Sequence, residues 1–276
     1  MKRLREKTVL VPGASRPVGR AIARKFASHG ATLILPVYDW PESISEMEEE
    51  FTEAGFNFFT FPADLRKKEQ VLALKEFITI QTQSLDFLIN NIERGGMPVV
   101  HGSYDLPHNK DQWDIEFDTT VKAKWLLFHH MLPLMHKRTG GAVVNISSIA
   151  GITGRSGPAA VFFNDGYSAA NKAIQIFTET WAREAAPIIR VNELMLGLIQ
   201  NRHGEGTRGW SSLSDQEKRY IENEILLERT GFPQEVADTT YFLAVEATYI
   251  TGACLRMDGG FTLGGNRVPS IPAGIL

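Results

Sequence analysis

A single cysteine, Cys254, is present among the 276 residues. One thiol forms no disulfide within the chain and supplies no thiolate-rich metal site. Cys254 follows the strand-like sequence YITGA, and we interpret it as a small buried hydrophobic residue. The histidines show no metal-ligand spacing, so no metal site is expected.

Long apolar runs are also missing. No run approaches the roughly 20 residues that a membrane-spanning helix needs, and the apolar segment Val9–Val11 is too short for a secretion signal. Charge of one sign is not in excess, since the net charge is -3 and the sequence pI is about 6.2. We therefore expect a cytoplasmic protein that binds neither nucleic acid nor a membrane.

Short apolar runs alternate with longer amphipathic stretches along the whole chain. Each apolar run is followed by a crossover long enough for a helix, which makes neighbouring strands parallel. The runs are apolar on both faces, as in a sheet covered by helices on both sides. The pattern predicts a Rossmann-type, doubly wound α/β fold with one domain over residues 1–276 and ligands outside the carboxyl ends of the strands. Strands are predicted over 8–13, 31–38, 56–64, 85–91, 140–148, 188–196 and 250–258, and helices over 20–30, 43–55, 67–82, 113–137, 167–186 and 233–245.

Two segments break this rhythm. Residues 200–220 are polar and glycine-rich and follow a strand end, which suits a lid over a substrate or an ordinary surface loop. Residues 264–276 show no helical period, and we expect an extended tail that can lie across a neighbouring subunit.

The stretch VLVPGASRPVGRAIA combines a strand, a glycine-bearing turn and the start of a helix. The N-terminus of a helix presents free N–H groups and a positive dipole end, so a phosphate fits there. Gly13 and Gly19 would permit a tight turn and close packing of helix on strand.

This turn and several later motifs together are similar to those of the short-chain dehydrogenase/reductase family over nearly the whole chain. The turn resembles the family's TGxxxGxG, NNIE at residues 90–93 stands for its NNAG, and NISSIAG contains the family's serine as Ser148. Tyr167 falls at the family's tyrosine, RVNELMLG stands for RVNxxxPG, and the stretch from RTGFPQEVADTTYFLAV to MDGG follows the family's C-terminal pattern.

The resemblance implies an NAD(P)-dependent oxidoreductase that interconverts a carbonyl and an alcohol on a small molecule. Ser148 would orient the substrate oxygen and Tyr167 would give or take the proton. Asn171 stands where the family has a lysine, four residues after the tyrosine, whereas Lys172 points about 100° away around the helix. The cofactor-binding residues carried over from the resemblance are Gly13, Ser15, Arg16, Val18, Gly19, Asp64, Leu65, Asn91, Ile92 and Ile199.

The cofactor motifs also depart from the family. Pro17 replaces the middle glycine of the turn, and Ile92 and Glu93 replace a small Ala-Gly pair near the expected adenosine. Arg16 falls where relatives that prefer NADP carry a basic residue, and it can pair with a 2′-phosphate. The second strand ends at Val37 without the acid that would hold a ribose diol. We therefore favour NADP(H) slightly over NAD(H).

The proton relay is modified as well. Thr120 replaces the family's helix asparagine. The loop over 151–166 is longer than in the family, and Arg155 within it either supplies the cation that the lysine would provide or packs as an ordinary loop residue. A neutral Asn171 contributes about 0.5–1.5 kcal/mol through a hydrogen bond, whereas lowering a tyrosine pKa by three units takes roughly 4 kcal/mol. Reduction should suffer less than oxidation.

Two other functions stay open. The first is a binding or assembly protein that keeps the fold without catalysis, and the second is a lyase-type relative that reuses Ser148 and Tyr167 without hydride transfer. The family's subunits commonly assemble through two long helices, which are apolar here (WLLFHHMLPLM and AIQIFTETW). We expect a homo-dimer or homo-tetramer.

Overall fold

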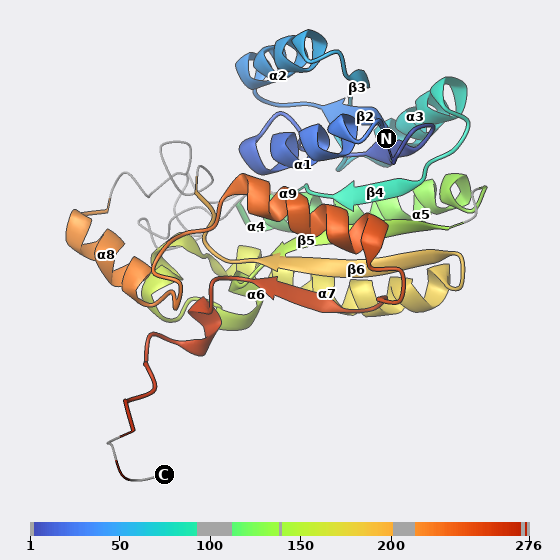
Figure 1. Cartoon of the computed structure of the whole chain (residues 1–276). Coiled ribbons are helices and arrows are strands. Elements are labelled where there is room, and N and C mark those ends of the chain that lie inside the picture. The colour runs from blue at the N-terminus through green and yellow to red at the C-terminus, as the bar shows by residue number, and fades with distance from the viewer. Residues whose placement is uncertain (1–2, 93–111, 138–139, 201–212, 272–273, 275–276) are drawn as a thin grey trace.

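The computed structural model describes residues 3–92, 112–137, 140–200, 213–271 and 274. Their strands form one seven-stranded sheet in the order β3-β2-β1-β4-β5-β6-β7, and all pairings are parallel (Figure 1). The order reverses between β1 and β4, which is the switch point where such sheets bind ligands. The predicted doubly wound α/β fold is confirmed. The strands are β1 (Thr8–Leu10), β2 (Thr32–Val37), β3 (Asn57–Pro62), β4 (Phe87–Asn90), β5 (Gly141–Ser148), β6 (Ile189–Leu196) and β7 (Cys254–Met257).

Helices cover both faces of this sheet. One apolar cluster joins the sheet to α1, α2 and α9, and a second joins it to α3, α5 and α7. A third, smaller cluster lies at the carboxyl end of the strands, beside α6 and α8 (Figure 1). The helices are α1 (Pro17–Ser28), α2 (Pro41–Glu53), α3 (Lys68–Gln81), α4 (Gln112–Glu116), α5 (Ala123–Met135), α6 (Ala150–Thr153), α7 (Asp165–Ala185), α8 (Asp215–Asn223) and α9 (Pro233–Tyr241).

Two predicted helices contain a π-helical turn. The helix expected over 113–137 is divided into α4, a π turn at Phe117–Lys122 and α5, and a second π turn at Phe242–Glu246 follows α9. Such turns widen the helix and frequently occur at functional sites. The apolar periodicity predicts the helix but does not reveal the extra residue in the turn.

Part of the predicted loop at 200–220 is helical. Ser214 and Glu217 form a capping box, in which the Ser214 hydroxyl accepts the Glu217 N–H at 3.3 Å and the Glu217 carboxylate accepts the Ser214 N–H at 2.8 Å. This box starts α8 at Asp215. Residues 215–220 of the segment predicted as a lid or surface loop are therefore helical, and residues 201–212 lie outside the described part.

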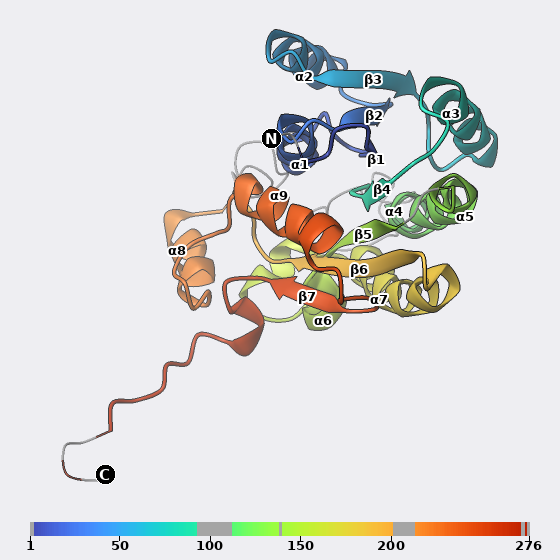
Figure 2. The same ribbon diagram turned by 45° about the vertical axis from the view of Figure 1, so that its right-hand side comes forward.

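The C-terminal region is largely exposed. Cys254 begins β7, the edge strand of the sheet, and its side chain is exposed, so the prediction of a buried residue is wrong. Residues 264–271 contain neither helix nor strand, and Figure 2 shows this tail leading away from the body. Arg267 on the tail pairs with Glu228 at 2.9 Å. No helix in the described residues is long and apolar enough to cross a membrane.

Candidate active site

Ser148 and Tyr167 meet at the carboxyl end of β5. Ser148 is the last residue of that strand, and Tyr167 lies in the first turn of α7. Asn164 caps α7, because its Oδ1 accepts the Tyr167 N–H at 2.6 Å, and this fixes where the helix begins. Both side chains are buried, and the Ser148 hydroxyl hydrogen-bonds the phenol of Tyr167.

The surroundings of Tyr167 favour the neutral phenol. Burial raises its pKa, and the nearby charge of Glu116 raises it further, whereas hydrogen bonds from Ser148 and Asn171 partly oppose both effects. The net result is a pKa above the ordinary value. At neutral pH the phenol of Tyr167 is therefore protonated.

Asn171 is a neutral side chain close to Tyr167. It is fully buried one turn after Tyr167, and its Nδ2 donates to the backbone carbonyl of Tyr167 at 3.0 Å. Its Oδ1 has no hydrogen-bond partner within the described residues. Lys172 points to solvent instead, where its Nζ donates to Gln175 at 2.9 Å. Lys172 is thus a surface charge of the helix.

The long loop before Tyr167 shields the phenol. It contains α6 and a short 3-10 turn at Pro158–Phe162, and Phe163 then packs on Tyr167 within the third apolar cluster. Arg155 in the same loop pairs at 3.5 Å with exposed Asp165. The contact of Arg155 is therefore one of loop packing, and the loop's contribution to Tyr167 is apolar.

Three buried charged residues near the site were not identified from the sequence. Glu116 ends α4, Lys124 lies in the first turn of α5, and Glu193 is in β6. The Lys124 ammonium donates at 2.5 Å to the carbonyl of Ile146, two residues before Ser148. Burial lowers the pKa of Lys124 to about 7, an effect that the charge of Glu193 partly opposes.

A sequence signal for these residues exists. Lys124 and Glu193 interrupt apolar runs (KAKWLLF and VNELML), and Glu116 lies four residues before Thr120 on the same helix face. A charged residue at a core-facing position is rare unless it is paired or functional. Ser147 hydrogen-bonds Glu193 beneath the site.

The glycine turn is closed tightly against the end of β4. Gly13 has φ +69°, and a Cβ there would lie 2.8 Å from the carbonyl oxygen of Asn91. A Cβ on Gly19 would lie 2.2 Å from the carbonyl oxygen of Gly13, so only glycine fits at either position. Asn91 also donates through Nδ2 to the carbonyl of Pro12 at 3.3 Å.

Pro17 is accommodated at the start of α1. It is the first residue of that helix, where a backbone N–H has no acceptor within the helix and the ring suits the helical φ. The N–H groups of Val18 and Gly19 belong to the same first turn and stay available to an anion. Ser15, just before the helix, is buried.

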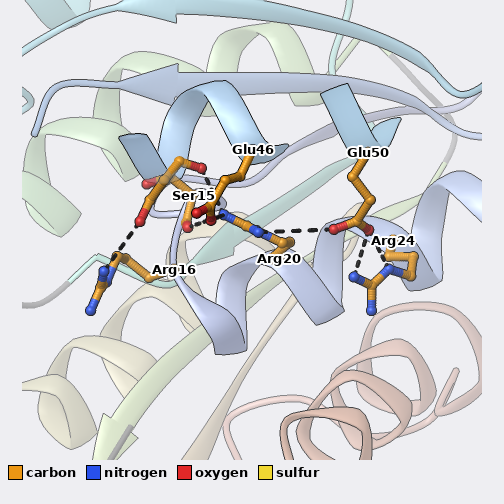
Figure 3. Close-up of polar contacts among 7 residues, drawn as sticks. Ser15, Arg16, Arg20, Arg24, Glu46 and Glu50 are labelled. Carbon is orange, nitrogen blue, oxygen red and sulfur yellow. Dashed lines mark hydrogen bonds and ion pairs between the residues drawn. The ribbon is translucent and has the colours of Figure 1, made fainter. Parts of the chain in front are cut away.

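Arginines gather between the start of α1 and α2 (Figure 3). The Arg16 guanidinium donates to Ser43 Oγ at 3.4 Å and lies 4.5 Å from the ring centroid of Trp40. Arg20 donates to the carbonyls of Ser15 and Ser43 at 2.9 and 2.6 Å. Burial, with the charge of Arg20, lowers the pKa of Arg16 and outweighs the opposing charge of Glu46. An added anion here would relieve this repulsion between cations.

The expected adenine end is also organised by an arginine. Arg66 pairs with both carboxylate oxygens of Asp64, at 2.8 and 2.9 Å, and lies 5.6 Å from the ring of Tyr38. Burial alone would raise the pKa of Asp64, but its hydrogen bonds with Arg66 lower it below the ordinary value. Leu65 is buried in the second apolar cluster.

The remaining predicted cofactor residues separate into two groups. Ile92 is partly buried and packs against the second apolar cluster. Ile199 is buried and forms a bridge with Gly231 close to the end of β6. Glu93, which we expect near the adenosine, lies outside the described residues.

These residues fit a dinucleotide. The glycine cradle leaves no room for a Cβ at Gly13 or Gly19, the first turn of α1 offers N–H groups for a pyrophosphate, and the buried Oδ1 of Asn171 is an acceptor that a sugar hydroxyl would satisfy. The described residues contain no group of three or more His, Cys, Asp or Glu side chains that could hold a metal.

A family model described as Enoyl-(Acyl carrier protein) reductase matches residues 13–262. The chain belongs to the short-chain dehydrogenase/reductase family. It is accordingly an oxidoreductase of the short-chain dehydrogenase/reductase type that depends on a nicotinamide cofactor.

Several known members of this family are similar over almost their entire length. A 3-oxoacyl-[acyl-carrier-protein] reductase FabG from Staphylococcus aureus is 30% identical over 256 residues, covering 92% of this chain and 97% of the relative. The uncharacterized oxidoreductase YxjF of Bacillus subtilis is 30% identical over 272 residues, with 94% and 99% covered.

Solved structures of the family show the same fold. A short-chain dehydrogenase/reductase from Burkholderia xenovorans superposes with a TM-score of 0.77 at 25% identity, covering 94% of this chain and 98% of its own. A double mutant of a Serratia marcescens short-chain dehydrogenase/reductase superposes with a TM-score of 0.79 at 24% identity, covering 94% and 99%.

Proposed function

We propose that this protein is an NADP(H)-dependent reductase that converts the carbonyl group of a small or medium-sized molecule into an alcohol. The observation that carries the proposal is the state of Tyr167, which is buried, hydrogen-bonded to Ser148 and held neutral by its surroundings. A neutral phenol donates a proton, as carbonyl reduction requires, but does not accept one, as alcohol oxidation would require.

Each residue of the site has a distinct role in the proposed reaction. When bound, the reduced nicotinamide supplies hydride. Ser148 donates a hydrogen bond that orients the carbonyl oxygen, and Tyr167 gives that oxygen its proton. Asn171 offers an acceptor, Oδ1, for a sugar hydroxyl of the cofactor. Because Asn171 carries no charge, it does not stabilise a phenolate as a lysine would, and oxidation is expected to be slow.

The preference for NADP(H) rests on the cluster between α1 and α2. Arg16 and Ser43 form the polar end of that cluster, with Trp40 beside them. Val37 ends β2 without a carboxylate that would repel a 2′-phosphate. A guanidinium supplies directed hydrogen bonds to a phosphate in addition to charge. The Glu46 carboxylate lies 3.5 Å from the Arg20 guanidinium and partly offsets the positive charge of the cluster.

The substrate class is suggested by two features. Relatives with 30% identity are named 3-oxoacyl-[acyl-carrier-protein] reductases, so a 3-oxoacyl thioester is the first carbonyl compound to test. The loop that carries Phe163 makes the surroundings of Tyr167 apolar, which suits an aliphatic substituent next to the carbonyl.

Binding of NADPH and NADH to the purified protein, measured by calorimetry, tests the proposal. We expect micromolar affinity for NADPH, weaker affinity for NADH, and reduction of carbonyl substrates by the NADPH complex. Failure of both nucleotides to bind at millimolar concentration would contradict the proposal. Turnover without any nucleotide would instead identify a lyase-type relative.

A binding or assembly protein is the second candidate. It is favoured by one observation: the described residues place no cation beside Tyr167, since Lys172 and Arg155 contact other partners. In either case we propose a homo-oligomer formed through α5 and α7, on which Trp125 and Ile176 are exposed. Light scattering with Trp125→Glu, expected to dissociate the oligomer, tests this interface.

A further inference from the structure

Glu116 places a second proton-carrying group at the interface that holds Tyr167. Its side chain is fully buried at the end of α4, and α4 packs against α7, the helix that carries Tyr167. In its ionised form Glu116 raises the pKa of Tyr167, so the two groups are electrostatically coupled. Burying a carboxyl group costs free energy, and Glu116 is buried at the interface that also holds Tyr167.

The same helix face carries a second polar group. Thr120 follows Glu116 by four residues, lies within the π turn and is fully buried. Its Oγ1 has no hydrogen-bond partner among the described residues. The π turn packs against α7. A buried carboxyl and a buried hydroxyl thus lie on two elements that pack against α7, the helix of Tyr167 and Asn171.

Other ionisable side chains of the described residues are engaged elsewhere. Lys172 contacts Gln175 at the surface, and Arg155 contacts Asp165. Lys124 donates to the backbone of β5 and has Glu193 as its charged neighbour. The pKa of Tyr167 responds to hydrogen bonds with Ser148 and Asn171 and to the ionised form of Glu116.

We propose that Glu116 is a relay residue that returns a proton to Tyr167 after each reduction, in place of the lysine that this chain lacks. The inference rests on the proposed reductase function. As the substrate oxygen takes the phenol proton, the Tyr167 O–H bond breaks and leaves a phenolate. The Glu116 carboxylic acid then gives its proton to the phenolate, and the carboxylate that remains regains a proton from water.

An infrared measurement on the protein without nucleotide tests the coupling directly. A protonated carboxyl group has a C=O stretching band distinct from that of a carboxylate. We expect such a band at neutral pH that disappears in Glu116→Gln and shifts in Tyr167→Phe. If Glu116→Gln does not fold, Glu116→Asp takes its place. A shift of the band in Glu116→Asp then assigns the band to Glu116. Glu193→Gln is the matched control, because Glu193 is an equally buried glutamate whose band should not respond to Tyr167→Phe.

Kinetics with NADPH provide the second readout. Glu116→Gln should lower kcat for reduction roughly 10- to 100-fold, at or below the lower end of the effect of a direct general acid, and change KM for the carbonyl substrate less than about threefold. Glu116→Asp should recover part of kcat, whereas Glu193→Gln should leave it within about threefold of wild type.

The two hypotheses fail in different ways. Absence of a protonated Glu116 band, or a band that ignores Tyr167→Phe, would overturn the relay even in an active enzyme. An unchanged kcat in Glu116→Gln would do the same. A protein that binds neither NADPH nor NADH would refute the reductase function, whatever the infrared coupling shows.

Discussion

Phe163 stacks on Tyr167, with ring centroids 5.9 Å apart and planes inclined by 26°. Both side chains are buried, so the extra residues of the loop act on the chemistry by removing water from the phenol. Removal of water favours the neutral form of a tyrosine. Through this contact, the longer loop is expected to favour reduction over oxidation.

Phe163→Ala should therefore change stability and chemistry together. Loss of the buried ring should lower the free energy of unfolding by about 3 kcal/mol, and readmitted water should lower the pKa of Tyr167. Oxidation of an alcohol should then gain relative to reduction of the carbonyl. Urea unfolding and paired rate measurements check this. Ile152→Ala, at an exposed position of the same loop, should stay within about 0.5 kcal/mol of wild type; equal stability of Phe163→Ala would contradict the argument.

Asn171→Lys should restore oxidation. A lysine four residues after Tyr167 would place positive charge beside the phenol, lower its pKa and allow it to accept a proton. We expect the oxidation rate to rise more than about tenfold and the reduction rate to rise less. Rates in both directions at one pH provide the measurement. Lys172→Ala should leave both rates unchanged, because its ammonium contacts Gln175 at the surface.

Arg16→Ala should discriminate between the two nucleotides. Loss of a charge-assisted hydrogen bond costs about 1.5–3 kcal/mol, so Kd for NADPH should rise roughly 10- to 100-fold. Kd for NADH should change less than about twofold, since NADH has no 2′-phosphate. The matched control is Arg24→Ala on the same helix, whose guanidinium pairs with Glu50. Equal losses for NADPH and NADH would show that Arg16 acts on the fold or on the pyrophosphate.

Lys124 should make stability depend on pH in the alkaline range. Its pKa falls from 10.5 to about 7 in the folded protein, so between these values the unfolded chain binds a proton that the folded chain does not. The free energy of unfolding should rise with pH across this window, by up to about 1.4 kcal/mol per pH unit. Below the window both states carry the proton, and the contribution is constant.

Lys124→Met should remove this slope. Urea unfolding between pH 7 and pH 10 measures it, and Lys172→Met, which alters an exposed lysine, should retain the wild-type slope. A slope that persists in Lys124→Met would mean that Lys124 stays charged in the folded protein, held by the Ile146 carbonyl and Glu193.

The sequence predicts the architecture well because apolar periodicity and glycine turns act over short distances. Alternating strands and helices require a parallel sheet, and Gly13 and Gly19 indicate the tight turn that the structure shows. Local rules fail where an element changes within a continuous pattern. The π turn at Phe117–Lys122 and the start of α8 at Asp215 are examples, although the Ser214–Glu217 capping box was visible in the sequence.

The sequence by itself determined the fold and the motifs of Ser148 and Tyr167, and it predicts that Asn171 stands where the family has a lysine. Only the tertiary structure decided which charges surround the phenol, because burial and neighbours depend on how separate helices pack. It places Glu116 against α7, directs Lys172 to solvent, and puts Lys124 beneath the strand that carries Ser148. Proton transfer depends on these distances through space, which spacing along a chain does not encode.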